Sequence, residues 1–271
     1  MKYIWRLQIL LFWLKEKRNV SFLSLLRAIS RPRFKKRASR YITSIQEEGA
    51  DYVVAFQEGQ KLYFPKSVSL AALYHVVCEI CDRKNWHYYE IPETKVKPDD
   101  IVVDCGAAEG LFSLLIQDRC REVYVIEPSP IFLTSISKTF KDKSNVTILP
   151  VALGKVTGTM YLTNEGMESK VSEKENGPAI TIETIDNLFF HQGKKITYLK
   201  ADIEGYELEM LEGARLTIKE CKPTIAITTY HHREDAKEIT HFLKSLCPDY
   251  NIITKGIDDT CGAPIMLHAW I

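Results

Sequence analysis

The sequence predicts an α/β protein with a doubly wound, mostly parallel sheet and an N-terminal extension of helices and a hairpin. From residue 101 onwards, short apolar runs alternate with segments of helical pattern, as in a parallel sheet with helices on both faces. The first run, residues 101–105, is almost entirely apolar, as in a strand buried on both faces. The last two runs have no helix between them, so we expect them to pair antiparallel at one edge.

The composition is that of a folded globular protein. Apolar residues make up 45% and charged residues 26% of the 271 positions, which excludes a disordered chain, a collagen-like chain and a coiled-coil rod. The seven cysteines are odd in number and scattered along the chain. We therefore expect reduced thiols and a cytoplasmic protein rather than a disulfide framework.

The charge is unevenly distributed along the chain. Residues 1–40 contain 12 Lys and Arg against one acid, and residues 41–271 contain 24 Lys and Arg against 34 acids, although the net charge is only +1. We expect three parts: a basic amphipathic helical head at 1–40, a hairpin and helix extension at 41–98, and the α/β domain at 99–271.

The basic head is expected to form two short helices, the second ending near Ser30 ahead of Pro32. Its longest apolar run, residues 9–14, is much shorter than the roughly 20 residues of a bilayer span, and no signal-peptide cleavage site follows. Two interpretations stay open. The head attaches peripherally to the inner face of an anionic membrane, or it packs on the main domain or a second subunit. A nucleic-acid-binding arm is a third, less favoured option, because no known binding module accompanies it.

The remaining elements follow from apolar periodicity and turn residues. In the extension we expect a hairpin at 52–56 and 61–65, a helix at 69–82 and a strand at 86–91, whose aromatic residues either pack in the core or cover a ligand. In the α/β domain we expect strands at 101–105, 122–127, 146–149, 196–201, 224–229, 250–254 and 264–269. The helices are expected at 111–119, 131–140, 184–191, 207–221 and 234–246, with an inserted strand pair at 157–163 and 179–182 around a polar loop at 164–178.

A glycine-containing turn follows the first strand of this domain and predicts a nucleotide-type ligand. Gly106 and Gly110 allow the backbone to turn tightly and approach a ligand, but their spacing is not the G-x-G-x-x-G of dinucleotide-binding proteins, and no P-loop is present. Asp104 suits a ligand that carries an amino group and a positive sulfonium. Glu127 ends the second strand, where a carboxylate can accept both hydroxyls of a ribose. Together these features predict S-adenosylmethionine as cofactor.

Several segments together resemble the FkbM-type family of S-adenosylmethionine-dependent methyltransferases. They are VDCGAAEGLFS (103–113), VIEPSP (125–130), VALG (151–154) with Gly158, TIETID (181–186), LKADIEGYELEMLEGA (199–214) and ITTYHHREDAKEI (227–239). The resemblance spans roughly residues 85–271. It implies a class I, Rossmann-like methyltransferase domain at 99–271, with seven strands of which the last is antiparallel. It also implies O-methylation of a sugar, a polysaccharide precursor or another small molecule.

The sequence departs from the family pattern at Cys105, at Ala108 and in the final sixteen residues, which leaves the acceptor undefined. The expected cofactor-binding residues follow the motifs: Asp104, Gly106, Ala107, Ala108, Glu109, Gly110, Glu127, Pro128, Ala152 and Asp202.

The expected catalytic residues are Asp202, Glu204 and His231, after the fourth and fifth strands of this sheet. The amino-methylase run D/N-P-P-Y/F and the Pro-Cys pair of cytosine methylation are both absent, and acidic residues here fit oxygen chemistry. His231, with an ordinary pKa near 6.5, is expected to be the general base. Asp202 is expected either to orient His231 or to contact the acceptor or the cofactor. His232 is a weaker candidate. The alternative is that these residues have no catalytic role. The acids then only stabilise the N-terminus of the following helix, and the histidines are surface residues.

No metal is expected, although Asp202, Glu204 and a histidine could bind a divalent ion. Cys78 and Cys81 are expected to be ordinary thiols of one helix. Two functions outside O-methylation remain: a cofactor-binding but inactive docking module, and an RNA methyltransferase suggested only by the basic head.

Overall fold

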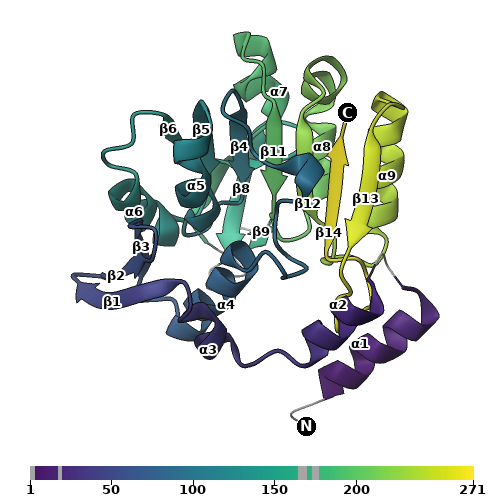
Figure 1. The fold of residues 1–271 in the computed structure, drawn as a ribbon. Coiled ribbons are helices and arrows are strands. Elements are labelled where there is room, and N and C mark those ends of the chain that lie inside the picture. The colour runs from purple at the N-terminus through teal and green to yellow at the C-terminus, as the bar shows by residue number, and fades with distance from the viewer. Residues whose placement is uncertain (1–3, 18–19, 164–169, 173–176) are drawn as a thin grey trace.

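The computed structural model describes residues 4–17, 20–163, 170–172 and 177–271. At its centre lies a seven-stranded sheet in the order β13-β14-β12-β11-β4-β5-β6 (Figure 1). Its strands are β4 (Ile101–Cys105), β5 (Glu122–Ile126), β6 (Val146–Leu149), β11 (Tyr198–Ala201), β12 (Thr224–Thr228), β13 (Asn251–Lys255) and β14 (Met266–Trp270). The strands from β12 to β6 pair in parallel, and β14 runs antiparallel to both of its neighbours. The expected sheet and its antiparallel last strand are confirmed.

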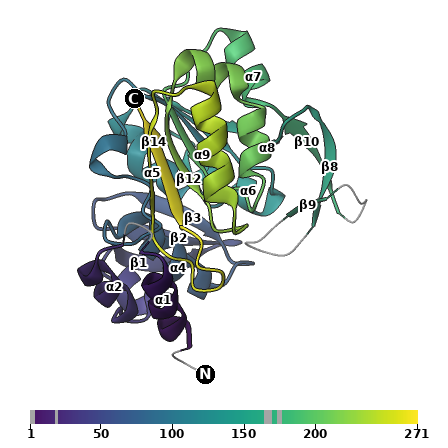
Figure 2. The ribbon, with the colours of Figure 1, turned by 90° about the vertical axis from the view of Figure 1, so that its right-hand side faces the viewer.

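Two hydrophobic layers cover the sheet, one on each face. Alternation along β4 shows this directly, because Val102 belongs to the layer under α4, α5 and α6, whereas Val103 belongs to the layer under α7, α8 and α9. Figure 2 shows α8 and α9 lying over one face of the sheet. The helices are α4 (Leu70–Cys81), α5 (Leu111–Ile116), α6 (Pro130–Thr139), α7 (Ile185–Leu188), α8 (Glu207–Glu212) and α9 (Asp235–Leu246). Helix α8 is followed by a π-helical turn at Thr217–Cys221 instead of continuing regularly to residue 221.

The extension before the domain forms a three-stranded antiparallel sheet, β1 (Ile42–Glu48), β2 (Asp51–Phe56) and β3 (Lys61–Pro65). The expected hairpin is β2 and β3, and β1 was not predicted because its sequence is mostly polar and exposed. The Ser69 hydroxyl accepts the Ala72 N–H and begins α4. The Tyr63 N–H donates to Thr139 Oγ1 at 3.0 Å, which ties β3 to α6.

The expected strand at 86–91 is wrong, since this segment forms turns. Its polar groups bond to side chains rather than to a neighbouring strand. The Trp86 indole donates to Ser24 Oγ at 2.9 Å, Lys255 donates to the Tyr88 carbonyl, and the Tyr198 hydroxyl donates to the Tyr89 carbonyl at 3.3 Å. The aromatic residues that resembled a strand therefore pack against three different parts of the molecule.

A second small sheet carries the inserted strands, in the order β7-β10-β8-β9. Its strands are β7 (Ala152–Leu153), β8 (Gly158–Thr163), β9 (Lys170–Ser172) and β10 (Ala179–Glu183). The expected antiparallel pair is confirmed as β8 and β10. Most of the expected loop at 164–178, namely residues 164–169 and 173–176, lies outside the described residues.

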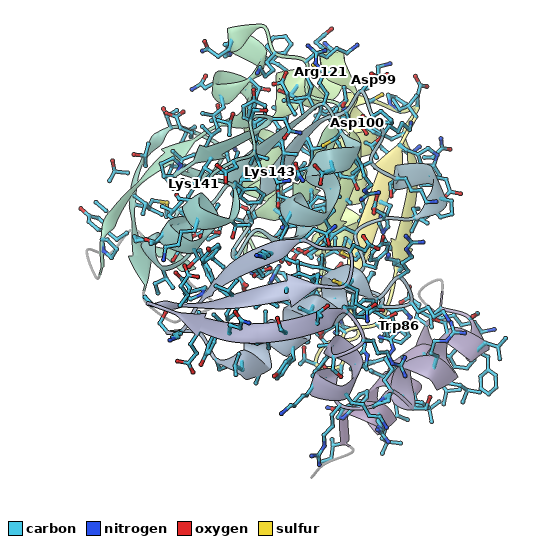
Figure 3. The ribbon with its side chains drawn as sticks, turned by 60° about the vertical axis from the view of Figure 1, so that its left-hand side comes forward. Trp86, Asp99, Asp100, Arg121, Lys141 and Lys143 are labelled. Atoms are coloured by element: carbon cyan, nitrogen blue, oxygen red, sulfur yellow. The ribbon has the colours of Figure 1, made fainter. Side chains whose placement is uncertain are left out.

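The described residues of the head form three short helices instead of the expected two: α1 (Ile4–Lys15), α2 (Phe22–Ile29) and α3 (Phe34–Ala38). Helix α2 is capped at Ser30, near the end expected for the second helix. One side of the head packs on the body, where Ile9 and Leu25 share a hydrophobic cluster with Trp86 and Ile257. Figure 3 shows Trp86 at this junction. Within the part of the chain that the structure describes, no helix is long and apolar enough to cross a membrane.

Candidate active site

A cavity of about 400 Å³ opens where β4, β5 and β11 end at one edge of the sheet. Ligands of doubly wound folds bind at this edge, outside the carboxyl ends of the parallel strands. The loop after β4 forms one wall, and α4 with His87 and Tyr89 forms the facing wall. Of the ten expected cofactor-binding residues, eight line the cavity: Gly106, Ala107, Ala108, Glu109, Glu127, Pro128, Ala152 and Asp202.

Gly106 is required by the close approach of two strand ends. Its φ is +69°, and a Cβ atom there would lie 2.1 Å from the Asp202 carbonyl oxygen. Lys200 crosses beneath it, and its ammonium donates to the Gly106 carbonyl at 2.8 Å. The loop after β4 is therefore fixed directly against the end of β11, which carries Asp202.

Glu127 is placed at the end of β5 as a buried acceptor. Its two carboxylate oxygens accept the N–H groups of Ala108 at 2.9 Å and Ser129 at 2.8 Å. Burial raises the pKa of Glu127 to about 7, although these two hydrogen bonds oppose the shift. A carboxylate has roughly four acceptor positions, so lone pairs remain for a pair of ribose hydroxyls on the cavity side.

Asp104 and Gly110, two of the ten expected cofactor-binding residues, do not line the cavity. The Asp104 carboxylate is fully buried, lies 2.9 Å from the Lys200 ammonium and accepts the Ser113 hydroxyl at 2.6 Å. Gly110 begins α5 with φ +83° and faces the ring of Phe140. Both residues therefore support the loop after β4 from outside the cavity.

Glu109 offers a second acidic group to the cavity. It is 1% exposed, and its Oε2 atom has no hydrogen-bond partner among the described residues. Burial raises its pKa to about 7. A buried acceptor without a partner is costly, and an ammonium group of a bound ligand would satisfy it. Glu127 for the ribose and Glu109 for the amino group together fit S-adenosylmethionine.

Asp202 stands at the centre of a polar cluster in the lining of the cavity. It accepts the Tyr89 hydroxyl at 2.7 Å and the Thr228 hydroxyl at 3.2 Å, and His87 Nε2 lies 3.5 Å away. Burial would raise the pKa of Asp202, but His87 and Lys200 outweigh it and hold the pKa below its ordinary value. Asp202 is therefore a carboxylate at neutral pH.

His231 lies behind Asp202 among three acids instead of lining the cavity. Its Nδ1 is 3.1 Å from Glu207 Oε1, and its Nε2 is 3.5 Å from Glu204 Oε2 and 3.9 Å from Asp202 Oδ1. Burial lowers the pKa of His231, but these carboxylates outweigh burial and raise it to about 10. The pKa of His231 is thus raised above the value near 6.5 that the sequence suggested. A protonated imidazole has no free lone pair to accept a proton, which argues against His231 as general base at pH 7.

The Asp202, Glu207 and His231 ligand atoms lie within 4.8 Å of one another, a grouping that could also hold a metal ion. Glu207 Oε1 already accepts the Ile203 N–H at 2.9 Å and the Thr228 hydroxyl at 3.3 Å. Glu204 lines the cavity, whereas His232 is exposed and pairs with Asp235.

His87 is a cavity residue that the sequence did not single out by itself. It lines the cavity, and neither ring nitrogen has a hydrogen-bond partner among the described residues. Burial lowers its pKa to about 4 even though Asp202 opposes the shift. The imidazole is therefore neutral at pH 7. Lys200 was also missed, although a single lysine within an apolar strand is a visible signal.

The family model described as "Methyltransferase FkbM domain" matches residues 104–250, which is more than half of the chain. The chain belongs to the FkbM methyltransferase family. S-adenosylmethionine is accordingly the cofactor of this domain, in agreement with the fit of the cavity. No curated protein matches the chain.

Among solved structures, the chain is similar to methyltransferase FkbM from Methylobacillus flagellatus KT, with 24% identity and a TM-score of 0.52. The match covers 91% of this chain and 59% of that one, so the chain spans little more than half of the longer protein. It is also similar to an rRNA methylase from Streptococcus thermophilus, with 15% identity, a TM-score of 0.42 and coverage of 64% and 87%. A third is Aeropyrum pernix fibrillarin with bound S-adenosyl-L-methionine, with 13% identity, a TM-score of 0.43 and coverage of 85% and 99%.

Proposed function

We propose that this FkbM methyltransferase domain transfers a methyl group to a hydroxyl of a small molecule, such as a sugar or polysaccharide precursor. The observation that carries the proposal is the position of neutral His87 in the cavity lining, with its Nε2 atom 3.5 Å from the Asp202 carboxylate. Bound S-adenosylmethionine supplies an electrophilic methyl group. The residues facing it are an imidazole, a carboxylate and a phenol, which suit an oxygen acceptor.

His87 takes the proton in this proposal, in place of His231. His87 Nε2 lies 3.5 Å from the Asp202 carboxylate. In the proposed reaction, Nε2 approaches and donates to this carboxylate, which leaves Nδ1 to accept the hydroxyl proton. As the acceptor oxygen bonds to the methyl carbon and the carbon–sulfur bond breaks, the hydroxyl becomes strongly acidic. A base with a pKa of about 4 is therefore sufficient, and Asp202 stabilises the imidazolium that forms. His231 and its acids hold Asp202 in position.

The experiment measures methyl transfer from labelled cofactor to a panel of hydroxylated acceptors. His87→Gln should lower kcat by about a hundredfold or more while the Kd of the cofactor stays near wild type. His241→Gln is the matched control, because His241 is an exposed residue of α9 and does not line the cavity. A fully active His87→Gln enzyme would exclude His87 as base. Turnover on RNA alone would favour the RNA methyltransferase, and cofactor binding without any turnover would favour the docking module.

We propose in addition that the head rests on an anionic membrane surface. Support comes from an exposed apolar stripe on α1, formed by Ile4, Leu7, Leu11 and Leu14, each at least half exposed. Phe22 and Leu23 on α2 are also exposed, at 57% and 73%. Large exposed apolar patches bordered by cations are typical of interfacial segments, and residues 1–40 carry one acid against 12 cations.

The packing and membrane interpretations of the head are compatible, because one side of α1 packs on the body and the other side is exposed. Ile9 is buried against the body, whereas Leu7 and Leu11 face away from it. Leu7→Glu/Leu11→Glu should abolish sedimentation with anionic vesicles and leave thermal stability near wild type. If wild-type protein ignores anionic vesicles at low salt, this proposal fails, and the exposed stripe belongs to a contact with protein.

A further inference from the structure

A basic pocket of about 260 Å³ lies at the junction of the head with the end of α4, separate from the cofactor cavity. Its lining comes from α2 and the residues that follow it, from α3 and the residues that follow it, and from the segment after α4. Its charged lining residues are Arg27, Arg31, Arg37, Arg40, Lys84 and Asp82. Five cations therefore meet one acid in this pocket.

Internal ion pairs do not neutralise this charge. Asp82 is engaged by Arg37, whose guanidinium lies 3.0 Å from it. Arg31 donates to the Lys84 carbonyl and to Asn85 Oδ1, at 3.4 Å for the latter, and both of these acceptors are neutral. Arg27, Arg40 and the Lys84 ammonium have no carboxylate partner among the described residues.

The crowding of cations contributes to the electrostatics of Arg31. Burial, together with the neighbouring Arg37 and Arg27 and against the opposing effect of Asp82, lowers the pKa of the Arg31 guanidinium to about 10. Cations that remain so close without an anion repel one another. A bound multivalent anion would remove this repulsion and restore the ordinary charge balance.

We propose that this pocket binds a phosphate group. Guanidinium groups form paired, charge-assisted hydrogen bonds with phosphate oxygens, and an excess of four positive charges suits a group with more than one negative charge. Arg27 follows directly after the exposed Leu26 of α2. A lipid headgroup whose chains lie beside α2 and a soluble phosphate compound would both present this chemistry. The proposal is independent of the methyl-transfer reaction.

Calorimetric titration of the full chain with inorganic phosphate tests the pocket. We expect saturable binding that is weakened at least tenfold in both Arg27→Gln and Arg40→Gln, two exposed positions whose replacement should not disturb folding. Lys141→Gln is the matched control, because Lys141 is exposed and lies far from the head in Figure 3. Circular dichroism melts verify that all three variants are folded.

The source of the phosphate is distinguished with vesicles of phosphatidylcholine alone or mixed with phosphatidic acid. Binding to the mixed vesicles that Arg40→Gln weakens assigns the pocket to a lipid headgroup, whereas phosphate binding without vesicle binding assigns it to a soluble compound. The proposal is overturned if wild-type protein does not bind phosphate saturably, or if Lys141→Gln weakens binding as much as Arg40→Gln. Binding of single-stranded RNA without saturable phosphate binding overturns it in favour of a diffuse nucleic-acid surface.

Discussion

The buried ion pair between Lys200 and Asp104 gives a quantitative test of how the cofactor loop is held. Both side chains are almost completely buried, at 4% and 0% exposed, and their charged atoms are 2.9 Å apart. Asp104 raises the pKa of the Lys200 ammonium although burial alone would lower it. Lys200→Met keeps the volume but leaves the Asp104 charge with only the Ser113 hydroxyl.

Removing one partner of a buried pair costs about 3–5 kcal/mol. Because 1 kcal/mol shifts the melting temperature of a large domain by about 2–4 °C, Lys200→Met should melt about 6–20 °C below wild type. The double variant Asp104→Asn/Lys200→Met should recover part of this loss, with a coupling energy of about 1–3 kcal/mol between the two sites. Chemical unfolding of the four proteins completes the cycle.

The same four proteins test whether Asp104 contacts the cofactor. In this structure Asp104 pairs with Lys200 and accepts the Ser113 hydroxyl, and it does not line the cavity. Asp104→Asn should therefore change the cofactor Kd less in the Lys200→Met background than in the wild-type background. If Asp104→Asn weakens cofactor binding by a further tenfold in the Lys200→Met background, Asp104 contacts the cofactor directly, as expected from the sequence. A Lys200→Met variant less than 1 kcal/mol below wild type would refute the reasoning on stability.

Four further results are expected. Glu127→Ala should weaken cofactor binding by about tenfold to a hundredfold in calorimetry, through lost charge-assisted hydrogen bonds. Glu79 belongs to α4 and lines the cavity. Its burial, followed by the charges of Asp202 and Glu109, raises its pKa from 4.5 to about 8. The stability that Glu79 contributes to the fold at low pH is therefore lost as pH rises through 8. Glu79→Gln should therefore match wild type in urea unfolding near pH 5 and exceed it near pH 9. On the acid side of its pH profile, kcat should decrease around pH 4, which is the pKa of His87, instead of around pH 6.5. Trp86→Ala should cost about 3–5 kcal/mol and increase proteolysis of the head.

The α/β domain could be predicted from sequence because its signals are local. Each parallel strand is a short apolar run, and each helix has its own periodicity, so the order of elements limits the topology to very few choices. The strand predicted at 86–91 was wrong because the contacts of this segment are not local. Its aromatic residues satisfy contacts with Ser24, Tyr198 and Lys255, which are distant in sequence and leave no local pattern.

The sequence predicts those site residues whose place is determined by the end of a strand. It does not predict the ionisation state of a side chain, because that state depends on neighbours brought together by the fold. Glu127 and Asp202 follow from their places after β5 and β11. The ionisation of His231 depends on Glu204 and Glu207, which the fold brings within 3.5 Å and 3.1 Å of its ring. His87 comes from outside the domain motifs, so no motif identifies it as part of the cavity.

The docking of α1 joins two ends of the chain that leave the ribosome at very different times. A Cβ atom at Gly262 would lie 2.6 Å from the ring of Phe12, so this glycine provides the space into which the ring fits. The two positions are 250 residues apart in the sequence. At about 5–20 residues per second, the nascent head waits about 10–50 s for its binding surface. During that interval, both sides of α1 are uncovered, and any early contact with a chaperone or a membrane is made by the whole helix.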